Sequence, residues 1–401
     1  MFMFTLILIT LLTIPLSLHT LGTISLILRL KEKVWLKPKP NFNSRIAILI
    51  PLYKERGESI ERTFRSITSQ VYDKNKMRVL IIMEKGDDET MKNVIDKCGI
   101  LDGSNIKYEI IVHPESRSSK AKSLNYALKF VDEPFIVVYD ADDDILDQYQ
   151  IARGVSLMSD GKYDSVGVKV LRSGSRLPQL FSYVETCLWV NIALPALKYI
   201  SSYPMYSGEG LFVATEVIKG IGGFPETLTE DSMLTVEFAK RGLKMALMDS
   251  IIIERGPYTI KSLIKQRMRW NRGLMQCFIK IIKEDVPLKV KIVNGLYYLS
   301  PISYLIISIS TIYVLLIAPI SKIIGFNPDP IPIYISIYLI ISVLISPLFL
   351  IVTGEKIWDK RAFIIPFPIW IIIGLTTLYS LIKPRVEWYR TERHPTKQLI
   401  S

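Results

Sequence analysis

Cysteine and histidine are scarce in this sequence of 401 residues. The cysteines lie far apart and without CxxC spacing, at Cys98, Cys187 and Cys277. They therefore give neither a disulfide framework nor a zinc site. His19 falls in an apolar segment and His394 near the end of the chain, which makes both poor partners for a catalytic triad. The glycine-rich phosphate loops GxGxxG and GxxxxGK(S/T) are also absent, so other residue types must carry the chemistry.

Charged residues are missing from long stretches of the chain. The mean hydropathy is +0.28 although 22% of the residues are charged, so the apolar residues must be segregated. They gather near residues 2–28, 293–320, 331–352 and 363–382, each roughly the ~20 residues that a bilayer crossing needs. The mixed-polarity stretch 31–290 is long enough to form its own core. The pattern predicts a membrane protein with one large domain and excludes a soluble protein, a disordered chain and a disulfide scaffold.

The first apolar segment predicts a membrane anchor. Residues 2–28 carry no charge, and basic residues follow at once: Arg29, Lys31, Lys33, Lys37 and Lys39. A signal peptide would need a basic start, a shorter apolar core and a cleavage site with small residues. Because basic residues stay on the cytoplasmic side, we expect the N-terminus outside and the large domain in the cytoplasm.

The net charge of +12 does not require a nucleic-acid partner. Residues 254–290 alone hold nine Lys or Arg against three Asp or Glu, and a basic stretch beside a membrane segment is more often a contact with lipid headgroups. The tail 383–401 is also basic, with five Lys or Arg against two Glu. An odd number of crossings would leave this tail outside. Either it is an exception to the charge rule, or the segment containing Pro366 and Pro368 does not cross fully.

The large domain shows the pattern of an open parallel α/β sheet. Short apolar runs at 45–52, 78–83 and 135–139 are typical of buried strands, and stretches 59–70 and 120–130 of helices. Strand, helix, strand, helix, strand builds such a sheet. Ligands bind at the carboxyl ends of its strands, so polar residues directly after the strands are the first candidates for a site.

Four carboxylates follow the last of these strands at Asp140, Asp142, Asp143 and Asp144. Like charges so close together are costly without a cation, and carboxylate oxygens beside phosphates suit Mg²⁺ or Mn²⁺. The alternative is a solvated acidic loop. A calcium EF-hand is excluded, because Ile145 stands where the loop needs glycine and Ile151 where it needs glutamate.

Two further motifs have both a structural and a functional interpretation. Residues 229–231 (TED) open a helical pattern that stops at Gly242, so Thr229 or Asp231 could simply cap a helix. In residues 266–270 (QRMRW), helical spacing places Gln266, Arg269 and Trp270 on one face. Such a face can bind a diphosphate and stack a sugar, or lie in a membrane interface.

The order of these motifs resembles the membrane-bound family 2 glycosyltransferases. Residues 50–55 (IPLYKE), 84–90 (EKGDDET) and 119–125 (SKAKSLN) are similar to that family's opening turn, DDGSxDxT and GKxxALN. Residues 140–142, 229–231 and 266–270 match its DxD, TED and QxxRW. The resemblance covers about residues 44–275. It implies a GT-A fold, a Rossmann-like α/β domain that binds nucleotide-diphospho-sugars, together with α-helical transmembrane segments.

The resemblance also implies a role for each motif residue. Donor-binding roles fall on Pro51, Tyr53, Glu55, Glu84, Asp88, Lys120, Asp140, Gln266 and Arg269. Asp140 and Asp142 would hold Mg²⁺ or Mn²⁺, and Asp231 would be the catalytic base. Glu230 and Trp270 would contact the acceptor. Glu84 and Ser119 depart from the family pattern, which has Asp and Gly at these two positions.

The implied enzyme is an inverting, metal-dependent glycosyltransferase that uses a nucleotide-diphosphate sugar, with a UDP-sugar favoured, and a membrane-associated lipid. A processive polysaccharide synthase with a glycan acceptor is the alternative, and a non-catalytic transporter or scaffold the alternative of another class. The expected organisation is an anchor (1–30), a cytoplasmic GT-A domain (31–254), basic interfacial helices (255–292), about three transmembrane helices (293–382) and a basic tail (383–401). We expect a multi-pass protein of the cell membrane with no nucleic-acid partner.

Overall fold

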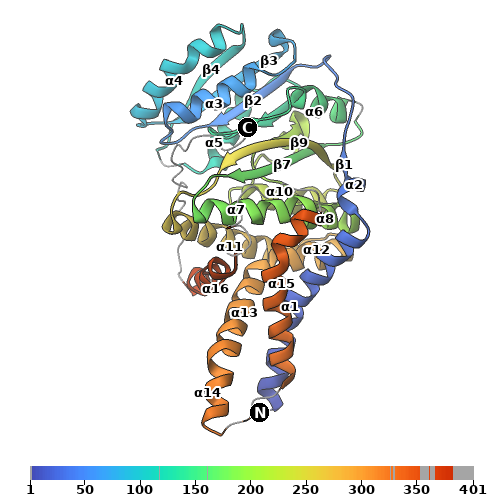
Figure 1. The fold of residues 1–401 in the computed structure, drawn as a ribbon. Helices are drawn as coiled ribbons and strands as arrows, with labels where there is room; N and C mark the ends of the chain where they lie inside the picture. Colours follow the sequence, from blue (N-terminus) through green and yellow to red (C-terminus); the bar gives the residue numbers. More distant parts are fainter. Residues whose placement is uncertain are drawn as a thin grey trace. The chain divides into compact units, whose positions relative to one another are not determined.

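The computed structural model describes residues 2–116, 118–159, 161–325, 327, 330–352, 361 and 366–382. The chain forms two compact units (Figure 1). The α/β unit consists of Glu32–Arg172 and Ser202–Arg255, and the helical unit of Met1–Lys31, Ser173–Ser201 and Gly256–Ser401. The expected division into consecutive segments placed residues 173–201 inside the α/β domain. In the structure these residues belong to the helical unit, and Leu177–Ser201 are helical.

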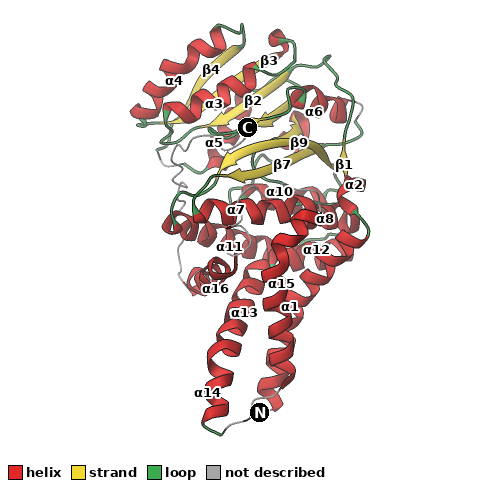
Figure 2. Ribbon diagram, in the orientation of Figure 1, coloured by secondary structure: helices red, strands yellow, loops and turns green. Residues whose placement is uncertain are grey.

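A nine-stranded sheet organises the α/β unit (Figure 2). Its strands are β1 (Trp35–Leu36), β2 (Ile46–Pro51), β3 (Met77–Glu84), β4 (Lys107–His113), β5 (Phe135–Val138), β6 (Asp144–Ile145), β7 (Ser165–Ser173), β8 (Leu211–Ala214) and β9 (Met245–Arg255). The order is β1-β9-β7-β8-β5-β2-β3-β4, and β6 pairs with β9. β2 runs parallel to β3 and β5, as the sequence predicted. The sheet as a whole is mixed, because β8 is antiparallel to both β5 and β7.

Helices alternate with the strands of the α/β unit: α3 (Gly57–Thr68), α4 (Asp88–Asp102), α5 (Lys120–Ala127), α6 (Gln150–Ser159), α9 (Thr215–Gly220) and α10 (Glu230–Lys240). α3 and α5 confirm the helices expected at 59–70 and 120–130. In α3 the residues at helical spacing, Ile60, Phe64 and Ile67, are fully buried. Helix α5 starts where the Ser119 hydroxyl accepts the N–H of Lys122 at 3.2 Å, a favourable N-cap.

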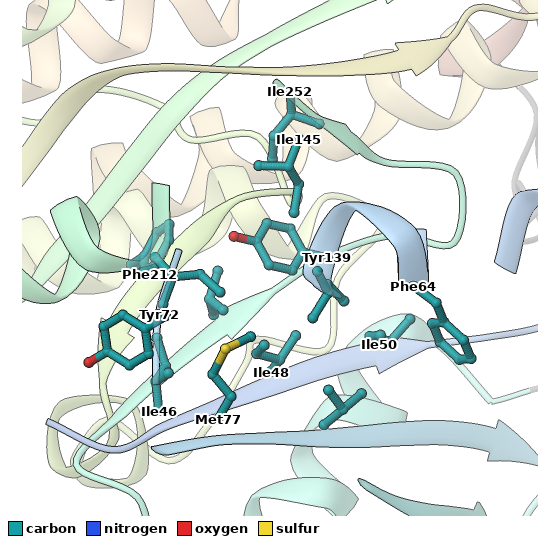
Figure 3. Close-up of a cluster of buried hydrophobic side chains, with 14 of the residues drawn as sticks. Ile46, Ile48, Ile50, Phe64, Tyr72, Met77, Tyr139, Ile145, Phe212 and Ile252 are labelled. Atoms are coloured by element: carbon teal, nitrogen blue, oxygen red, sulfur yellow. The ribbon is translucent and has the colours of Figure 1, made fainter. Parts of the chain in front are cut away.

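The core of the α/β unit lies against β2 (Figure 3). Ile46, Ile48 and Ile50 alternate along this strand and are fully buried, and Phe64 and Tyr139 belong to the same cluster. Full burial of each such side chain contributes about 1.5–3 kcal/mol. The hydroxyl of Tyr139 donates to Oε1 of Gln150 at 2.8 Å, which satisfies the one polar atom that this ring buries. The strand that leads to Asp140 is therefore rigidly fixed.

The start of the α/β unit is tied to the edge of the sheet. The short strand β1 pairs with β9, with Trp35 opposite Leu247. Beyond β1, Lys37 lies 3.1 Å from a carboxylate oxygen of Asp249, and Lys169 contacts the other oxygen. The Lys169 ammonium also lies 5.0 Å from the centre of the Trp35 ring, so charge and cation–π contacts hold this edge together.

The helical unit contains α1 (Phe2–Ile27), α7 (Leu177–Leu188), α8 (Leu194–Ser201), α11 (Ile260–Lys283), α12 (Leu288–Tyr298), α13 (Ser300–Ile312), α14 (Ala318–Ile323), α15 (Pro330–Val352) and α16 (Pro366–Ile382). Single π-helical turns connect α7 to α8 and α13 to α14. Among the described residues, two continuous helices are long and apolar enough to cross a bilayer, Leu177–Ser201 and Ser300–Ile323. Three shorter apolar helices are Leu12–Ile27, Pro332–Leu344 and Pro368–Ile382.

These helices match the expected membrane segments only in part. Residues 300–323 are long and apolar enough for the segment expected near 293–320. Residues 177–201 were not expected, and their most apolar stretch is 78% buried. The described part of α16 starts at Pro366, and proline is tolerated in the first turn of a helix. The 17 residues of α16 span about 25 Å, somewhat short of the ~30 Å hydrocarbon core. The basic tail 383–401 lies outside the described residues.

Candidate active site

The candidate site lies at the carboxyl ends of three neighbouring parallel strands in the α/β unit. β2 ends at Pro51, β3 ends at Glu84, and Asp140 is the second residue after β5. Since β2 lies between β3 and β5, these residues share one edge of the sheet, where parallel α/β sheets bind ligands. The structure thus brings together the three strand ends that the sequence singled out.

Lys120 connects two of the predicted motifs. Its Nζ donates to Oδ1 of Asp140 at 2.6 Å and to the carbonyl of Gly208 at 3.3 Å, and lies 4.0 Å from Oε1 of Glu230. Burial acts to lower the pKa of Lys120, but the charges of Asp140, Glu230 and Glu209 outweigh it and raise that pKa. The lysine is therefore a fixed cation between the DxD and TED residues.

Gly208 allows this close approach. A methyl group in place of its hydrogen would lie 3.0 Å from Nζ of Lys120, 3.4 Å from Oε1 of Glu230 and 3.7 Å from Oδ2 of Asp231. The backbone at Gly208 is thus within reach of all three charged groups. Asp231 is the second residue of α10 and half-buried. Its Oδ1 accepts the N–H of Ser232 at 2.7 Å, so the carboxylate is oriented by the helix that carries it.

A second group of acids, Asp142, Asp143 and Glu254, offers a cation site. One oxygen from each lies within 4.8 Å of the others, and all three residues are buried. Oδ2 of Asp143 accepts the N–H of Asp140 at 2.8 Å, while its buried Oδ1 makes no hydrogen bond to the described part of the chain. Hard carboxylate oxygens in this number suit Mg²⁺ or Mn²⁺, so these residues fit a divalent ion.

The acids of this site depend on each other's charge. Burial raises the pKa of Asp143 well above its usual range, and the charges of Asp140, Glu209 and Asp142 raise it further. Burial, with the charges of Glu254 and Asp140, also raises the pKa of Glu209 to about 8. The guanidinium of Arg172 forms an ion pair with Glu254 and offsets one negative charge. The remaining negative charge favours a cation.

The loop after β2 is held in a strained conformation by the start of α4. Lys54 has a φ of +55°, uncommon outside glycine. Its N–H donates to Oδ2 of Asp87 at 2.5 Å, and the N–H of Glu55 donates to the hydroxyl of Thr90 at 2.8 Å. Asp87, which also caps α4, therefore faces the predicted donor loop, whereas Asp88 is exposed in the first helical turn.

Two hydrogen-bonded groups order the remaining motif residues of the α/β unit. The hydroxyl of Ser118 donates to Oε1 of the buried Glu84 at 3.1 Å and lies 2.7 Å from the hydroxyl of Ser123. The amide of Asn125 pairs with the backbone of Phe224, at 2.8 Å as donor and 2.6 Å as acceptor. Tyr53 is half-buried, with the ammonium of Lys54 5.3 Å from its ring centre.

The QxxRW residues lie in the helical unit. Gln266, Arg269 and Trp270 lie on α11, which confirms the predicted helix. Gln266 is buried and the other two are half-buried. The structure thus brings Lys120, Asp140, Asp142, Glu230 and Asp231 into one site of the α/β unit. It places the QxxRW residues in the other unit.

The sequence analysis assigned no role to five residues near the predicted motifs: Asp87, Asp143, Arg172, Glu209 and Glu254. Two of them had a visible signal. Asp143 belongs to the acidic run after β5, and Glu254 ends a buried apolar strand as Glu84 does. Glu209 lies between two glycines in a loop, which carries no such periodic signal.

Comparison with known proteins agrees with this geometry. Residues 43–273, more than half of the chain, match the model of the glycosyltransferase like family 2. The probable glycosyltransferase YdaM of Bacillus subtilis (strain 168) is 25% identical over 375 residues, 87% of each chain. A cellulose synthase catalytic subunit (UDP-forming) of Komagataeibacter sucrofermentans is 26% identical over 58% of this chain, but only 31% of that protein is covered.

Among solved structures, the mannosyltransferase PcManGT from Pyrobaculum calidifontis shares the fold with a TM-score of 0.59. It was solved with GDP-Man and Mn²⁺, and the alignment covers 93% of this chain and 98% of that one at 18% identity. The α/β unit therefore has a GT-A-like fold with a mixed sheet. The protein is a glycosyltransferase and belongs to the glycosyltransferase like family 2.

Proposed function

We propose that this protein is an inverting, membrane-anchored glycosyltransferase that transfers a sugar from a nucleotide-diphosphate sugar to a lipid acceptor. The observation that carries the proposal is the convergence on Gly208, where Lys120 lies beside Asp140 and Glu230 and where Asp231 is in reach. A fixed cation beside a half-buried carboxylate suits a displacement that releases a negatively charged diphosphate.

Each group of this site has a task in such a displacement. Asp231 takes the proton of the acceptor hydroxyl as its oxygen attacks the anomeric carbon from the face opposite the leaving group. Lys120 interacts with the diphosphate, and Glu230 orients the acceptor. Asp142 belongs to both the predicted pair and the acidic cluster, and with Asp143 and Glu254 it would hold the divalent ion. When bound, Mg²⁺ or Mn²⁺ stabilises the negative charge of the departing diphosphate.

The donor is tested with purified protein in membrane lipids and a panel of UDP- and GDP-sugars. The sequence favours a UDP-sugar, and the cellulose synthase relative is named UDP-forming. PcManGT was solved with GDP-Man, so both nucleotides belong in the panel. Release of nucleotide diphosphate with one donor identifies it, and NMR of the product's anomeric carbon reports the stereochemistry. Retention of configuration would rule out the single displacement by the acceptor oxygen, with Asp231 as its base.

Asp142→Asn tests the metal. We expect this variant to lose most activity, and a chelator such as EDTA to do the same to the wild type. Asp96→Asn is the matched control, because Asp96 is an exposed aspartate within α4 and its loss should leave transfer unchanged. Full turnover in excess EDTA contradicts the assignment of a catalytic metal.

A processive polysaccharide synthase is the second candidate, and the similarity to cellulose synthase catalytic subunits favours it. The two candidates differ in their products. A lipid glycosyltransferase adds one sugar to an extractable lipid, whereas a synthase gives a ladder of polymer masses. Mass spectrometry of the product from the donor experiment distinguishes them directly.

Membrane attachment with a cytoplasmic α/β unit completes the proposal. The apolar helix Ser300–Ile323, which is long enough to cross a bilayer, and the basic residues after 2–28 support it. We expect Gly57→Cys, in a chain without its native cysteines, to react with an impermeant thiol reagent only after cells are permeabilised. Labelling in intact cells would reverse the proposed orientation.

A further inference from the structure

The largest fully buried side chain of the described residues is a cation, Arg267 of α11. Only 1% of this residue is exposed. Its Nη2 forms an ion pair with Oε2 of Glu185 on α7, and its Nη1 donates to Oε1 of Gln266 at 3.0 Å. Its guanidinium carbon lies 4.2 Å from the centre of the Trp270 ring. One side chain thus contacts two residues of the QxxRW motif.

Such an arrangement is costly unless each contact is made. A buried guanidinium has lost its water, and only a well-formed ion pair with further hydrogen bonds compensates for that loss. Glu185 supplies the charge, Gln266 an amide oxygen and Trp270 an aromatic face. A methionine or leucine would fill the space without this cost, so stability alone gives little reason for a charge here.

We propose that Arg267 is the positioning residue for Gln266 and Trp270, with Glu185 holding Arg267 in place. The hydrogen bond from Nη1 fixes which end of the Gln266 amide faces the guanidinium. The planar guanidinium against the indole fixes the tilt of the Trp270 ring. The inference rests on the proposed function, in which Gln266 contacts the donor diphosphate and Trp270 stacks the acceptor.

The test removes both charges together. Removing Glu185 or Arg267 alone leaves a buried unpaired charge, which destabilises the fold whatever the role of the pair. The double variant Arg267→Met with Glu185→Gln leaves no unpaired charge, so we expect its unfolding temperature to return close to that of the wild type. Transfer should stay impaired, because nothing then orients Gln266 and Trp270. A loss in kcat/KM of ~10–100-fold is expected for misplaced binding groups.

Arg267→Lys decides the question if the double variant does not fold. Lysine can keep the ion pair with Glu185 but cannot bond Gln266 and stack on Trp270 as the planar fork does. We expect this variant to fold, with a raised donor KM and a lowered kcat. The matched control is Glu284→Gln. This change removes the ion pair between Lys280 and Glu284 at the C-terminal end of the same helix, and it should leave both kcat and the donor KM unchanged.

A second readout does not depend on activity. The fluorescence of Trp270 is obtained as a difference spectrum, by subtracting the spectrum of the same protein with Trp270→Phe. Acrylamide should quench this fluorescence more in the double variant than in the wild type. The positioning role is overturned if the wild type transfers sugar and either variant, the folded double variant or Arg267→Lys, keeps a kcat/KM within threefold of the wild-type value. Unchanged quenching overturns it as well. Absence of transfer by the wild type with every donor contradicts the proposed function, while the quenching still tests the position of Trp270.

Discussion

Asp231→Asn separates a catalytic role from a structural one. Asp231 is the second residue of α10, and its Oδ1 accepts the N–H of Ser232 at 2.7 Å. The N-cap residue Thr229 makes no side-chain capping bond, so the carboxylate is the group that serves the first turn. Asparagine has nearly the same shape and keeps an oxygen for that hydrogen bond. It cannot take a proton from an acceptor hydroxyl.

The two roles predict effects of different size on stability and on the rate of transfer. Losing a negative charge in the first turn of a helix costs about 0.3–1 kcal/mol of stability. Losing a general base lowers the rate ~10²–10⁴-fold, equivalent to about 2.7–5.4 kcal/mol of activation free energy at 1.36 kcal/mol per factor of ten. We therefore expect a small drop in unfolding temperature and a large drop in kcat. The donor KM should hardly change, since the nucleotide does not contact this residue in the proposed mechanism.

The assay measures sugar transfer at saturating donor, with nucleotide binding by calorimetry as a separate check. Glu216→Gln is the matched control, because Glu216 is an exposed acid in the first turn of α9. It should reproduce the effect on helix stability without the effect on transfer. An Asp231→Asn enzyme that works within about threefold of the wild type would refute the base assignment and the inverting displacement built on it.

Three further predictions concern the stability of the α/β unit and the binding of the donor. Gly223→Ala should lower the free energy of unfolding by about 1–3 kcal/mol, because Gly223 has a φ of +92° and a Cβ there would lie 2.3 Å from the amide oxygen of Asn125. Burial acts to raise the pKa of Asp249, but the hydrogen bonds and charges of two lysines outweigh it and lower that pKa. Asp249→Asn should thus lower the free energy of unfolding by about 1.5–3 kcal/mol at pH 7. This difference should begin to shrink below the ordinary Asp pKa of ~3.9 and vanish only once the pH has fallen through the lower pKa that Asp249 has in the folded protein. Asp87→Ala should raise the donor KM several-fold in steady-state kinetics, and more than Asp88→Ala does.

Each of these predictions has a control or a contrary outcome. Gly220→Ala is the control for the turn, because a Cβ at Gly220 meets nothing within 4 Å and its effect on chemical unfolding should be small. A pH-independent cost of Asp249→Asn would show that packing, not charge, is lost. A larger KM effect at Asp88 than at Asp87 would favour the donor contact that the sequence resemblance implied.

The sequence predicts the centre of the α/β unit well because its signals are local. Apolar runs give β2, β3 and β5, and helical spacing gives α3 and α5. Lys120 and Asp140 are found because each lies next to such an element. The sequence does not predict which strands become neighbours in the sheet. Glu254 follows Asp142 by more than a hundred residues, and only the fold of β9 against β6 brings them together. No local pattern encodes that pairing.

The helix Leu177–Ser201 was missed for a related reason. Its sequence carries Glu185, Asn191 and Pro195 within an otherwise apolar stretch, so it lacks the uninterrupted hydrophobic run of a membrane segment. The polar residues are tolerated because the folded unit supplies their contacts. Glu185 pairs with Arg267 from another helix. The amide of Asn191 donates to the carbonyl of Cys187, one turn earlier in the same helix, at 2.8 Å. Tertiary contacts decide here where local hydropathy cannot.

The interleaving of the two units restricts the order in which the chain can mature. The chain leaves the α/β unit after Arg172, returns at Ser202 and leaves again after Arg255. During synthesis, the sheet acquires its last strand only when residue 255 has been made, and by then the helix Leu177–Ser201 already exists. Its neighbours in the helical unit α11, α15 and α16 are still to come. A chain truncated at residue 255 would have every strand of the sheet and an apolar helix that keeps its contacts with α1 but lacks those with α11, α15 and α16. The apolar surface left exposed in this way favours aggregation. Expression of the α/β unit alone therefore requires that residues 173–201 be removed as well and the chain rejoined across the gap.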